Sequence, residues 1–160
     1  MKDLKAKLER FKTKYKMILP KEYEDFIYSI DEDSYHNKVI KFKDKDIVID
    51  RFLISSNEPE YDILVRYEDS WQAKFGTPDT NEFLTIAVDN GDNGIAIKVH
   101  GEDLGKIYYL EYRDNMDVYG IIEDEPISVH IYKLFDGFQE FKDYLDNAPI
   151  AGARKYGRIK

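Results

Sequence analysis

The sequence predicts a single α+β domain with a central, largely antiparallel sheet of about six strands, flanked by N-terminal helices and a C-terminal helix. Apolar residues recur with the helical period before residue 31 and again after residue 136. Between them lies a run of segments with the alternating period of strands, and strands in a run favour antiparallel pairing. A length of 160 residues with 42% apolar content is sufficient for one buried core.

Two helices are expected before residue 31. Residues 1–16 predict a basic amphipathic helix, and we expect its narrow apolar face to dock on the body of its own domain. That face carries Leu4, Leu8, Phe11 and Tyr15. A second helix is expected from Pro20, a residue that suits the first helical turn, to the acidic stretch 31–37. Its apolar residues recur at Tyr23, Phe26, Ile27 and Ile30.

The middle of the chain changes to the period of strands. Two short strands joined by a turn at 43–45 are expected first, and a meander with tight glycine-containing turns follows. The expected strands are VIKF at 39–42, DIVIDRFLI at 46–54, FLTIAVD at 83–89, GIAIKVHG at 94–101, GKIYYLEY at 105–112 and ISVHIY at 127–132. Between 57 and 80, Ile63, Leu64 and Tyr67 favour a helix, whereas KFGTPDTNE indicates a turn-rich connection.

A closing helix is expected over residues 136–148. Asp136 is placed to cap it, and Gln139 follows three residues later as the capping-box partner. Phe138, Phe141 and Leu145 would face the core. Residues 154–160 form a basic tail, so residues 1–160 are expected to be one domain with a basic segment at each end.

The charge of the chain is unevenly distributed. The net charge is −8, yet residues 1–16 hold seven basic against two acidic residues and residues 154–160 hold four basic and no acidic ones. This leaves 13 basic and 30 acidic residues between 17 and 153, a net of −17. Such a body repels nucleic acid and attracts basic partners. An acidic surface that only keeps the protein soluble is the alternative.

Composition excludes several classes of protein. Cysteine is absent, so neither disulfides nor thiolate chemistry are available. No apolar run approaches the roughly 18 residues needed to span a bilayer. The charged, helical start MKDLKAKLER lacks the features of a secretory signal, and a cytoplasmic protein without membrane contact is expected.

The stretch VDNGDNGI, residues 88–95, resembles a metal loop at first sight. Aligned on Asp89 as an EF-hand loop, it places Gly91 where a ligand is required and His100 where the bidentate Glu should stand. Its glycines and asparagines instead tolerate the positive φ that a tight turn requires. We therefore predict a hairpin turn between two half-buried strands.

Catalytic signatures are missing. His36, His100 and His130 are scattered without metal-ligand spacing, and His130 alternates with apolar neighbours as a residue on the outer face of a strand would. No GxSxG, SxxK, phosphate-binding loop or GxGxxG occurs. Adjacent acidic pairs arise from composition, so a carboxylate-dependent hydrolase or metal enzyme is only a residual hypothesis. We expect no enzyme, cofactor or metal.

Trp71 lies in RYEDSWQAKFG, where aromatic residues alternate with charge. An aromatic residue on a loop can anchor an interface. It can equally be a core residue under a long connection. The sequence leaves both readings open.

Four elements in order resemble the SMI/KNR group within the SUKH superfamily. They are LPKEYEDFI at 19–27, TIAVDNGDNGIAIKV at 85–99, GEDLGKIYYLEYRD at 101–114 and LFDGFQEFKDYL at 134–145. The turn carries fewer glycines than is usual in that group, and Tyr109 or Tyr112 stands where the next strand usually ends in Trp. Residues 51–80 match no motif of the group.

The resemblance implies a sheet flanked by helices and a role in binding proteins. Bacterial members are immunity proteins that neutralise a toxin encoded beside them, commonly a nuclease; fungal members regulate cell-wall synthesis through protein contacts. The leading hypothesis is an immunity protein that covers a basic nuclease surface and does not itself bind nucleic acid. A regulatory scaffold with several partners is the alternative, and a homodimer stays open. The candidate contacts are Glu68, Asp69, Trp71, Glu102, Asp103, Glu111 and Asp114.

Overall fold

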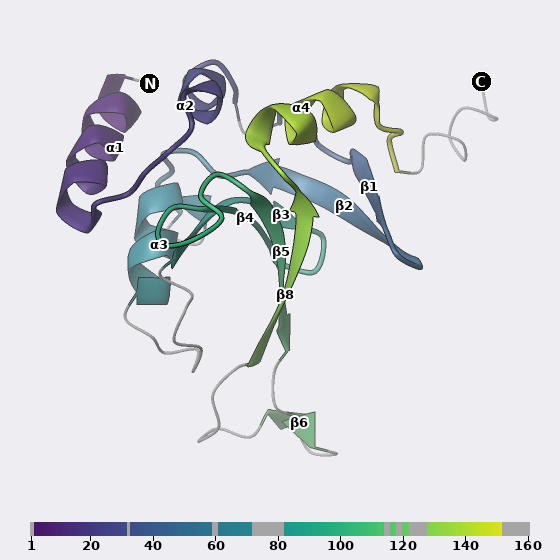
Figure 1. Ribbon diagram of the computed structural model, residues 1–160. Helices are drawn as coiled ribbons and strands as arrows, with labels where there is room; N and C mark the ends of the chain where they lie inside the picture. The colour runs from purple at the N-terminus through teal and green to yellow at the C-terminus, as the bar shows by residue number, and fades with distance from the viewer. Residues whose placement is uncertain are drawn as a thin grey trace.

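In the part of the chain that is described, six strands form one antiparallel sheet in the order β1-β2-β3-β4-β5-β8 (Figure 1). The computed structural model describes residues 2–31, 33–58, 61–71, 82–113, 116–117, 120–121 and 128–151. The strands of the sheet are β1 (Val39–Phe42), β2 (Lys45–Phe52), β3 (Phe83–Asp89), β4 (Gly94–Lys98), β5 (Ile107–Arg113) and β8 (Ser128–Phe135). The predicted fold class is confirmed.

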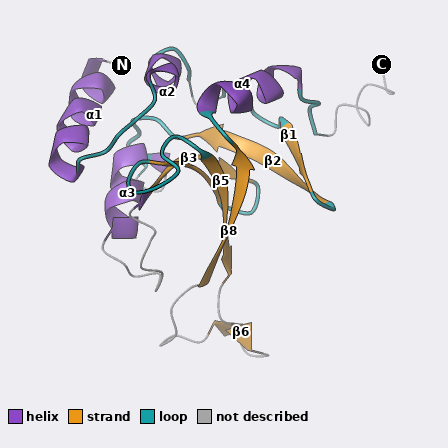
Figure 2. Ribbon diagram, viewed as in Figure 1, coloured by secondary structure: helices purple, strands orange, loops and turns teal. Residues whose placement is uncertain are grey.

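The described residues contain four helices and one further hairpin. The helices are α1 (Lys2–Tyr15), α2 (Lys21–Ile27), α3 (Ile63–Trp71) and α4 (Phe138–Asn147). In Figure 2, α1, α2 and α4 lie toward one end of the sheet and α3 lies beside its central strands. The hairpin of β6 (Met116–Asp117) and β7 (Gly120–Ile121) was not predicted, because two-residue strands carry no periodic signal. No helix among these residues has the length and apolar character to cross a membrane.

The helix α1 docks on the body of the domain, as its apolar face predicts. Leu4 and Leu8 are both 0% exposed and belong to the main core cluster. On the side facing α2, the Lys12 ammonium group lies 2.6 Å from a carboxylate oxygen of Glu24. Burial of two leucines contributes about 4 kcal/mol, so apolar packing rather than the ion pair holds this basic helix in place.

Aromatic side chains join α2 to α4 and both helices to the sheet. The ring of Phe26 lies 5.0 Å from that of Phe138 in α4 and 5.1 Å from that of Phe52 in β2, measured between centroids. Tyr23 meets Phe138 edge-on at 5.3 Å. The predicted core positions Tyr23, Phe26 and Ile27 of α2 and those of α4 are confirmed, and their contacts fix the helix pair over the ends of β2 and β8. The expected extent of the second helix is wrong: α2 ends at Ile27, so Ile30 lies beyond it and is only partly buried.

The sheet is strongly curved. Its first and last strands, β1 and β8, approach one another through Phe42 and Tyr132, whose ring centroids are 5.3 Å apart. Lys43, in the turn after β1, places its ammonium group 4.8 Å from the Tyr132 ring centroid. The β1–β2 hairpin therefore folds over the far edge of the sheet, which favours burial of the face that the helices also cover.

The predicted cap of α4 is wrong. The N-cap residue is Gly137, which makes no side-chain cap bond, and the carboxylate of Asp136 instead pairs with Lys133 at 2.8 Å. The backbone N–H of Asp136 donates to the Glu140 carboxylate at 3.3 Å. Because the N-cap lies one residue later than expected, Glu140 rather than Gln139 occupies the third helical position and accepts this N–H.

The alternation predicted for the last strand is only partly confirmed. His130 is exposed, as expected, and its ring stacks on Tyr132, with centroids 6.4 Å apart. Ile131, which points to the opposite face, is 40% exposed. Neither face of this edge strand is fully covered at that point, which is why a simple in–out pattern fails.

Candidate functional site

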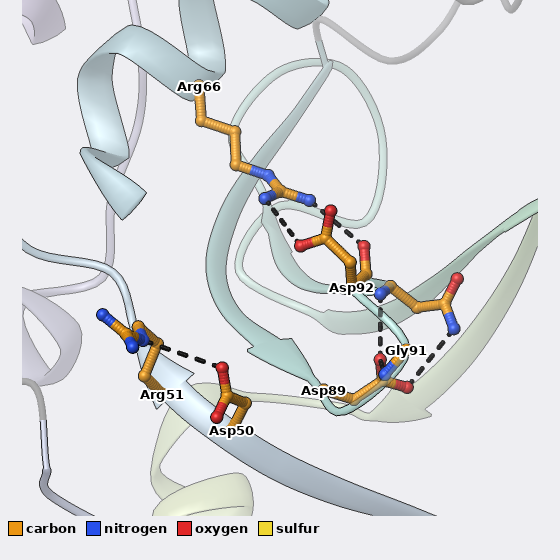
Figure 3. Close-up of polar contacts among 7 residues, drawn as sticks. Asp50, Arg51, Arg66, Asp89, Gly91 and Asp92 are labelled. Carbon is orange, nitrogen blue, oxygen red and sulfur yellow. Dashed lines mark hydrogen bonds and ion pairs between the residues drawn. The ribbon is translucent and has the colours of Figure 1, made fainter. Parts of the chain in front are cut away.

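The β3–β4 turn, residues 89–93, is built around one buried carboxylate. Asp89 ends β3 and is 8% exposed. Its Oδ1 accepts the backbone N–H groups of Gly91 at 2.8 Å and Asn93 at 2.9 Å (Figure 3). Its Oδ2 accepts the Tyr109 hydroxyl at 2.6 Å and the side-chain amide of Asn93 at 3.4 Å. Because a carboxylate has about four acceptor positions, the protein's own donors use all of them.

A side chain from α3 holds the tip of this turn. Arg66 donates to the Asp92 carboxylate at 3.3 Å and to the Asp92 carbonyl oxygen at 3.4 Å (Figure 3). Asp92 has a φ of 62°, in the left-handed region. The turn is confirmed, but the left-handed residue is this aspartate rather than a glycine or an asparagine. The strands it joins are buried rather than half-buried as predicted, because each supplies residues to both core clusters. Aspartate tolerates that conformation better than most residues, and Arg66 anchors it there.

The histidines lie in different parts of the fold. Nδ1 of His36 lies 2.7 Å from the backbone oxygen of Asp50, and Nε2 of His100 contacts the backbone oxygen of Tyr15. His130 stacks on a tyrosine of β8, as described above. Within the described ranges, no group of three or more His, Asp or Glu side chains is arranged to hold a metal ion. The histidines therefore have local structural contacts.

Glu111, one of the predicted partner contacts, lies on the helix-covered face of β5. Its carboxylate is 2.7 Å from the ammonium group of Lys45, and its side chain is 16% exposed. The same ammonium group lies 4.9 Å from the ring centroid of Tyr109. Burial, reinforced by the hydrogen bond to Asp89, raises the pKa of Tyr109. This group of side chains ties β2 to β5 and to the β3–β4 turn.

Glu102 and Asp103, also predicted contacts, lie on the β4–β5 loop, residues 99–106. Both residues are exposed. Asp103 pairs with Lys106 at 3.1 Å, whereas the Glu102 carboxylate has no hydrogen bond or ion pair with any described residue. Leu104 follows and is 41% exposed. The loop therefore presents an acidic pair and an apolar side chain to solvent.

The backbone of the β4–β5 loop is tightly constrained. Gly105 donates its N–H to the Lys98 carbonyl oxygen at 2.9 Å, and Lys106 donates to that of Asp103 at 3.2 Å. Gly101, Asp103 and Gly105 all adopt left-handed conformations, with φ values of 76°, 61° and 83°. Glycine adopts this conformation without steric cost. The loop is therefore ordered by its backbone and glycines, which leaves its side chains available.

The segment between α1 and α2 lies against this loop and extends its exposed surface. Ile18 donates its N–H to the Val99 carbonyl oxygen at 3.1 Å, and a Cβ built on Gly105 would lie 3.4 Å from Pro20. Ile18 is 57% exposed, the highest value among the large apolar residues described. We call the four neighbouring exposed residues the loop surface: Ile18, Glu102, Asp103 and Leu104.

The other predicted contacts lie wholly or in part outside the described residues. Glu68, Asp69 and Trp71 lie in the last turn of α3, and their side chains are outside the described residues, as is all of Asp114. The structure brings Glu102 and Asp103 together and places Glu111 near the opposite end of β5. The two possible roles of Trp71 both stay predictions.

Several residues important to this region were missed by sequence reasoning. The Asp62 carboxylate caps α3 by accepting the N–H groups of Leu64 and Val65, both at 3.0 Å. An aspartate directly before an apolar helical run is a visible N-cap signal. Arg66 and Tyr109 had no such signal, because their bonds to the turn join residues 26 and 20 positions apart.

The site is a protein surface on a curved antiparallel sheet, with ordered acidic loops at both ends of β4. The chain belongs to the SMI1 / KNR4 family (SUKH-1), whose family model matches residues 4–145. Comparisons with curated proteins and with solved structures gave no match. The match confirms the resemblance drawn from the four sequence elements and extends it across most of α1.

Proposed function

We propose that this chain is an immunity protein of a bacterial toxin system, which binds a cognate toxin and neutralises it without catalysis. Its family includes bacterial immunity proteins. The observation that carries the proposal is the loop surface, where the exposed Glu102 carboxylate, which has no partner among the described residues, lies on a constrained backbone with the exposed apolar residues Ile18 and Leu104. A constrained surface loses little conformational entropy when it binds a partner.

The charge of the body supports a basic partner, and we propose that the toxin is a nuclease. A nuclease must hold the phosphate backbone in a positively charged groove. The chain carries a net −17 between residues 17 and 153. Opposite fields of this kind accelerate association and favour one partner over others. Attraction of this origin should weaken as salt is added.

Co-expression with the product of the neighbouring gene tests the proposal. We expect that protein to be toxic alone, to be harmless with this chain, and to form a stable complex with it. Toxicity that persists in the presence of the folded chain, or a neighbouring product with no toxic activity, would contradict an immunity role. Recovery of several weakly bound cellular proteins instead of one tight partner would favour the scaffold alternative.

A charge reversal locates the interaction. Replacing both carboxylates of the loop surface, Glu102→Lys with Asp103→Lys, should abolish protection while leaving the chain folded. The matched control is Asp44→Lys with Asp46→Lys, which makes the same change of charge on two exposed carboxylates of the β1–β2 hairpin at the other end of the sheet. We expect the control to protect as well as the unchanged chain. Equal loss of protection in both variants would show that net charge, not the loop surface, matters.

A further inference from the structure

A groove lies along α4, and none of the described contact candidates Glu102, Asp103 and Glu111 lines it. Its volume is about 450 Å³. One face of α4 supplies one wall, and the end of β8 together with the segment after α4 supplies the rest. The lining residues are Phe135, Glu140, Asp143, Tyr144, Asn147, Ala148 and Pro149.

The floor of the groove is apolar and well supported. Phe135 is 8% exposed, and its ring centroid lies 5.3 Å from that of Tyr144. The Tyr144 hydroxyl accepts the backbone N–H of Lys41 in β1 at 3.0 Å, which fixes the orientation of the ring. Ile150, one residue beyond the groove, is 49% exposed and extends the apolar surface. The aromatic ring is therefore held in position at the groove rather than free to turn away.

The rim of the groove is acidic, and its carboxylates have no ion-pair partner among the described residues. Glu140 accepts a backbone N–H at 3.3 Å, and Asp143 accepts the side-chain amide of Gln139 at 2.9 Å. Neither forms an ion pair with any residue in the described ranges. The third carboxylate of the same helix does have such a partner: Asp146 pairs with Lys142 at 2.9 Å.

One positive group contacts the lining. Lys38 donates to the carbonyl oxygen of Ala148 at 2.9 Å. Two of the lining residues carry carboxylates and none carries a cationic group, so this one lysine leaves the groove with an excess of negative charge. A cationic side chain with an extended apolar stem would satisfy the rim and cover the floor at the same time.

We propose that the α4 groove is an anchor site for an arginine side chain of a partner protein. A guanidinium group can stack on the Tyr144 ring and donate to the rim carboxylates through its fixed fork of N–H groups. It is also less strongly hydrated than the ammonium group of lysine, so moving it onto an apolar floor is less unfavourable. The inference rests on the proposed function, in that the basic toxin would supply the arginine.

A titration that needs no toxin tests the groove itself. The full chain, labelled with ¹⁵N, is titrated with N-acetyl-arginine methylamide, and the neutral isostere N-acetyl-citrulline methylamide is the matched control ligand. We expect saturable shifts of the Asn147 side-chain amide and of backbone amides in 140–148 with the arginine ligand, and at least about fivefold weaker binding of citrulline. Equal shifts with both ligands, or shifts spread over all acidic surfaces, would overturn the proposal.

Two conservative substitutions sharpen this test. Glu140→Gln and Asp143→Asn keep the acceptor atoms used inside the protein and remove the charge, so together they should abolish the arginine-specific shifts. Glu22→Gln, which neutralises an exposed carboxylate on α2, should leave them unchanged. If the double variant binds as well as the unchanged chain, the rim is not the recognition element and the proposal fails.

A shortened chain separates a partner's arginine from the chain's own. Residues 152–160 include Arg154 and Arg158, and the last lining residue is Pro149. A chain ending at Ala151 should bind the arginine ligand with unchanged affinity. An affinity that rises severalfold would identify the chain's own basic residues as the occupant and contradict a partner site.

The toxin then separates the two proposals. If the chain protects cells and Glu140→Gln with Asp143→Asn weakens the toxin complex about tenfold, both proposals are supported. If protection and affinity are unchanged in this variant, the immunity function stands and the anchor site is wrong. If arginine binds the groove but no neighbouring toxin is neutralised, the groove stands as a binding site and the proposed function fails.

Discussion

The two loops at the ends of β4 are both ordered and both acidic, but they use their carboxylates in opposite ways. In the β3–β4 turn, Asp89 accepts four hydrogen bonds from the protein, and Arg66 engages Asp92. In the β4–β5 loop, glycines and backbone hydrogen bonds set the conformation, and Glu102 has no partner among the described residues. The first loop uses its carboxylates to stabilise the fold, and the second leaves the Glu102 side chain exposed to solvent, as the proposed interface requires.

This difference gives a general criterion for reading acidic loops. A carboxylate whose acceptor positions are filled by local N–H and O–H groups stabilises the turn and has no capacity left for a ligand. A carboxylate that a constrained backbone holds near solvent can still accept hydrogen bonds from a ligand. The turn most similar to an active site in sequence is therefore structural, and the plainer loop after it is the candidate interface.

The largest expected effect comes from Asp89→Ala. It removes the acceptor for four donors, including the Tyr109 hydroxyl, so the free energy of unfolding should fall by about 3 kcal/mol. Urea denaturation measures this loss. The matched control in the same turn is Asp92→Asn, which keeps a residue that tolerates positive φ and should lose less than about 1 kcal/mol. Similar losses in both variants would contradict a turn organised by Asp89.

Glycine substitutions compare the backbones of the two loops. Gly101 has a φ of 76°, and a Cβ there would lie 2.8 Å from a carboxylate oxygen of Glu82. At Gly91 the nearest atom would be the Asn93 side-chain amide nitrogen at 3.2 Å, and no positive φ is required. Gly101→Ala should therefore destabilise by about 1–2 kcal/mol, and Gly91→Ala by less. Thermal unfolding of both variants decides this, and the reverse order would show that the β4–β5 loop is not glycine-dependent.

Alkaline pH tests the bond between Tyr109 and Asp89. Because the pKa of Tyr109 is raised in the folded chain, its phenol keeps a proton that the unfolded chain releases above about pH 10. The associated stability is fully present below that pH and is lost as pH rises. Tyr109→Phe should therefore lose less stability between about pH 9 and 11 than the unchanged chain. Urea denaturation of both proteins at the two pH values measures the difference. Equal losses of unfolding free energy in the variant and the unchanged chain would contradict a buried Tyr109 hydroxyl bonded to Asp89.

The smallest expected effect on stability is that of Glu102→Gln. The carboxylate is exposed and unpaired among the described residues, so the free energy of unfolding should change by less than about 0.5 kcal/mol. Chemical denaturation of Glu102→Gln and Asp89→Ala under the same conditions compares their unfolding free energies directly. A loss comparable to that of Asp89→Ala would reveal a structural role for the β4–β5 loop carboxylate and weaken the comparison.

Much of the fold was predictable because it depends on local periodicity. The strands of the meander begin and end within a few residues of the expected positions, and the buried faces of α1 and α2 follow their apolar spacing. The cap of α4 was not predictable, because the pairing of Asp136 with Lys133 depends on how β8 enters the helix. The local apolar period predicts where helices and strands form. Where an element begins or ends depends on which partners its terminal side chains find in the folded chain.

The candidate site was predictable only in part. The exposed acidic pair at Glu102 and Asp103 follows from its place in a glycine-flanked loop. The contribution of Ile18 does not, because the segment after α1 reaches the loop only through tertiary hydrogen bonding to Val99. Glu111 illustrates the converse, since its pairing with Lys45 depends on the curvature of the sheet. The sequence pattern therefore identifies residues that are candidates for a surface site, but it does not show which residues lie beside them in the fold.

The most direct test of the account measures the affinity of the purified chain for the protein encoded by the neighbouring gene. Two variants that neutralise carboxylates are compared with the unchanged chain. One carries Glu102→Gln with Asp103→Asn in the β4–β5 loop, and the other carries Asp92→Asn in the β3–β4 turn. We expect the loop variant to raise Kd at least about tenfold and the turn variant to raise it less than about twofold. A tight complex that tolerates the loop variant but not the turn variant, or no complex with either or with the unchanged chain, would contradict the account.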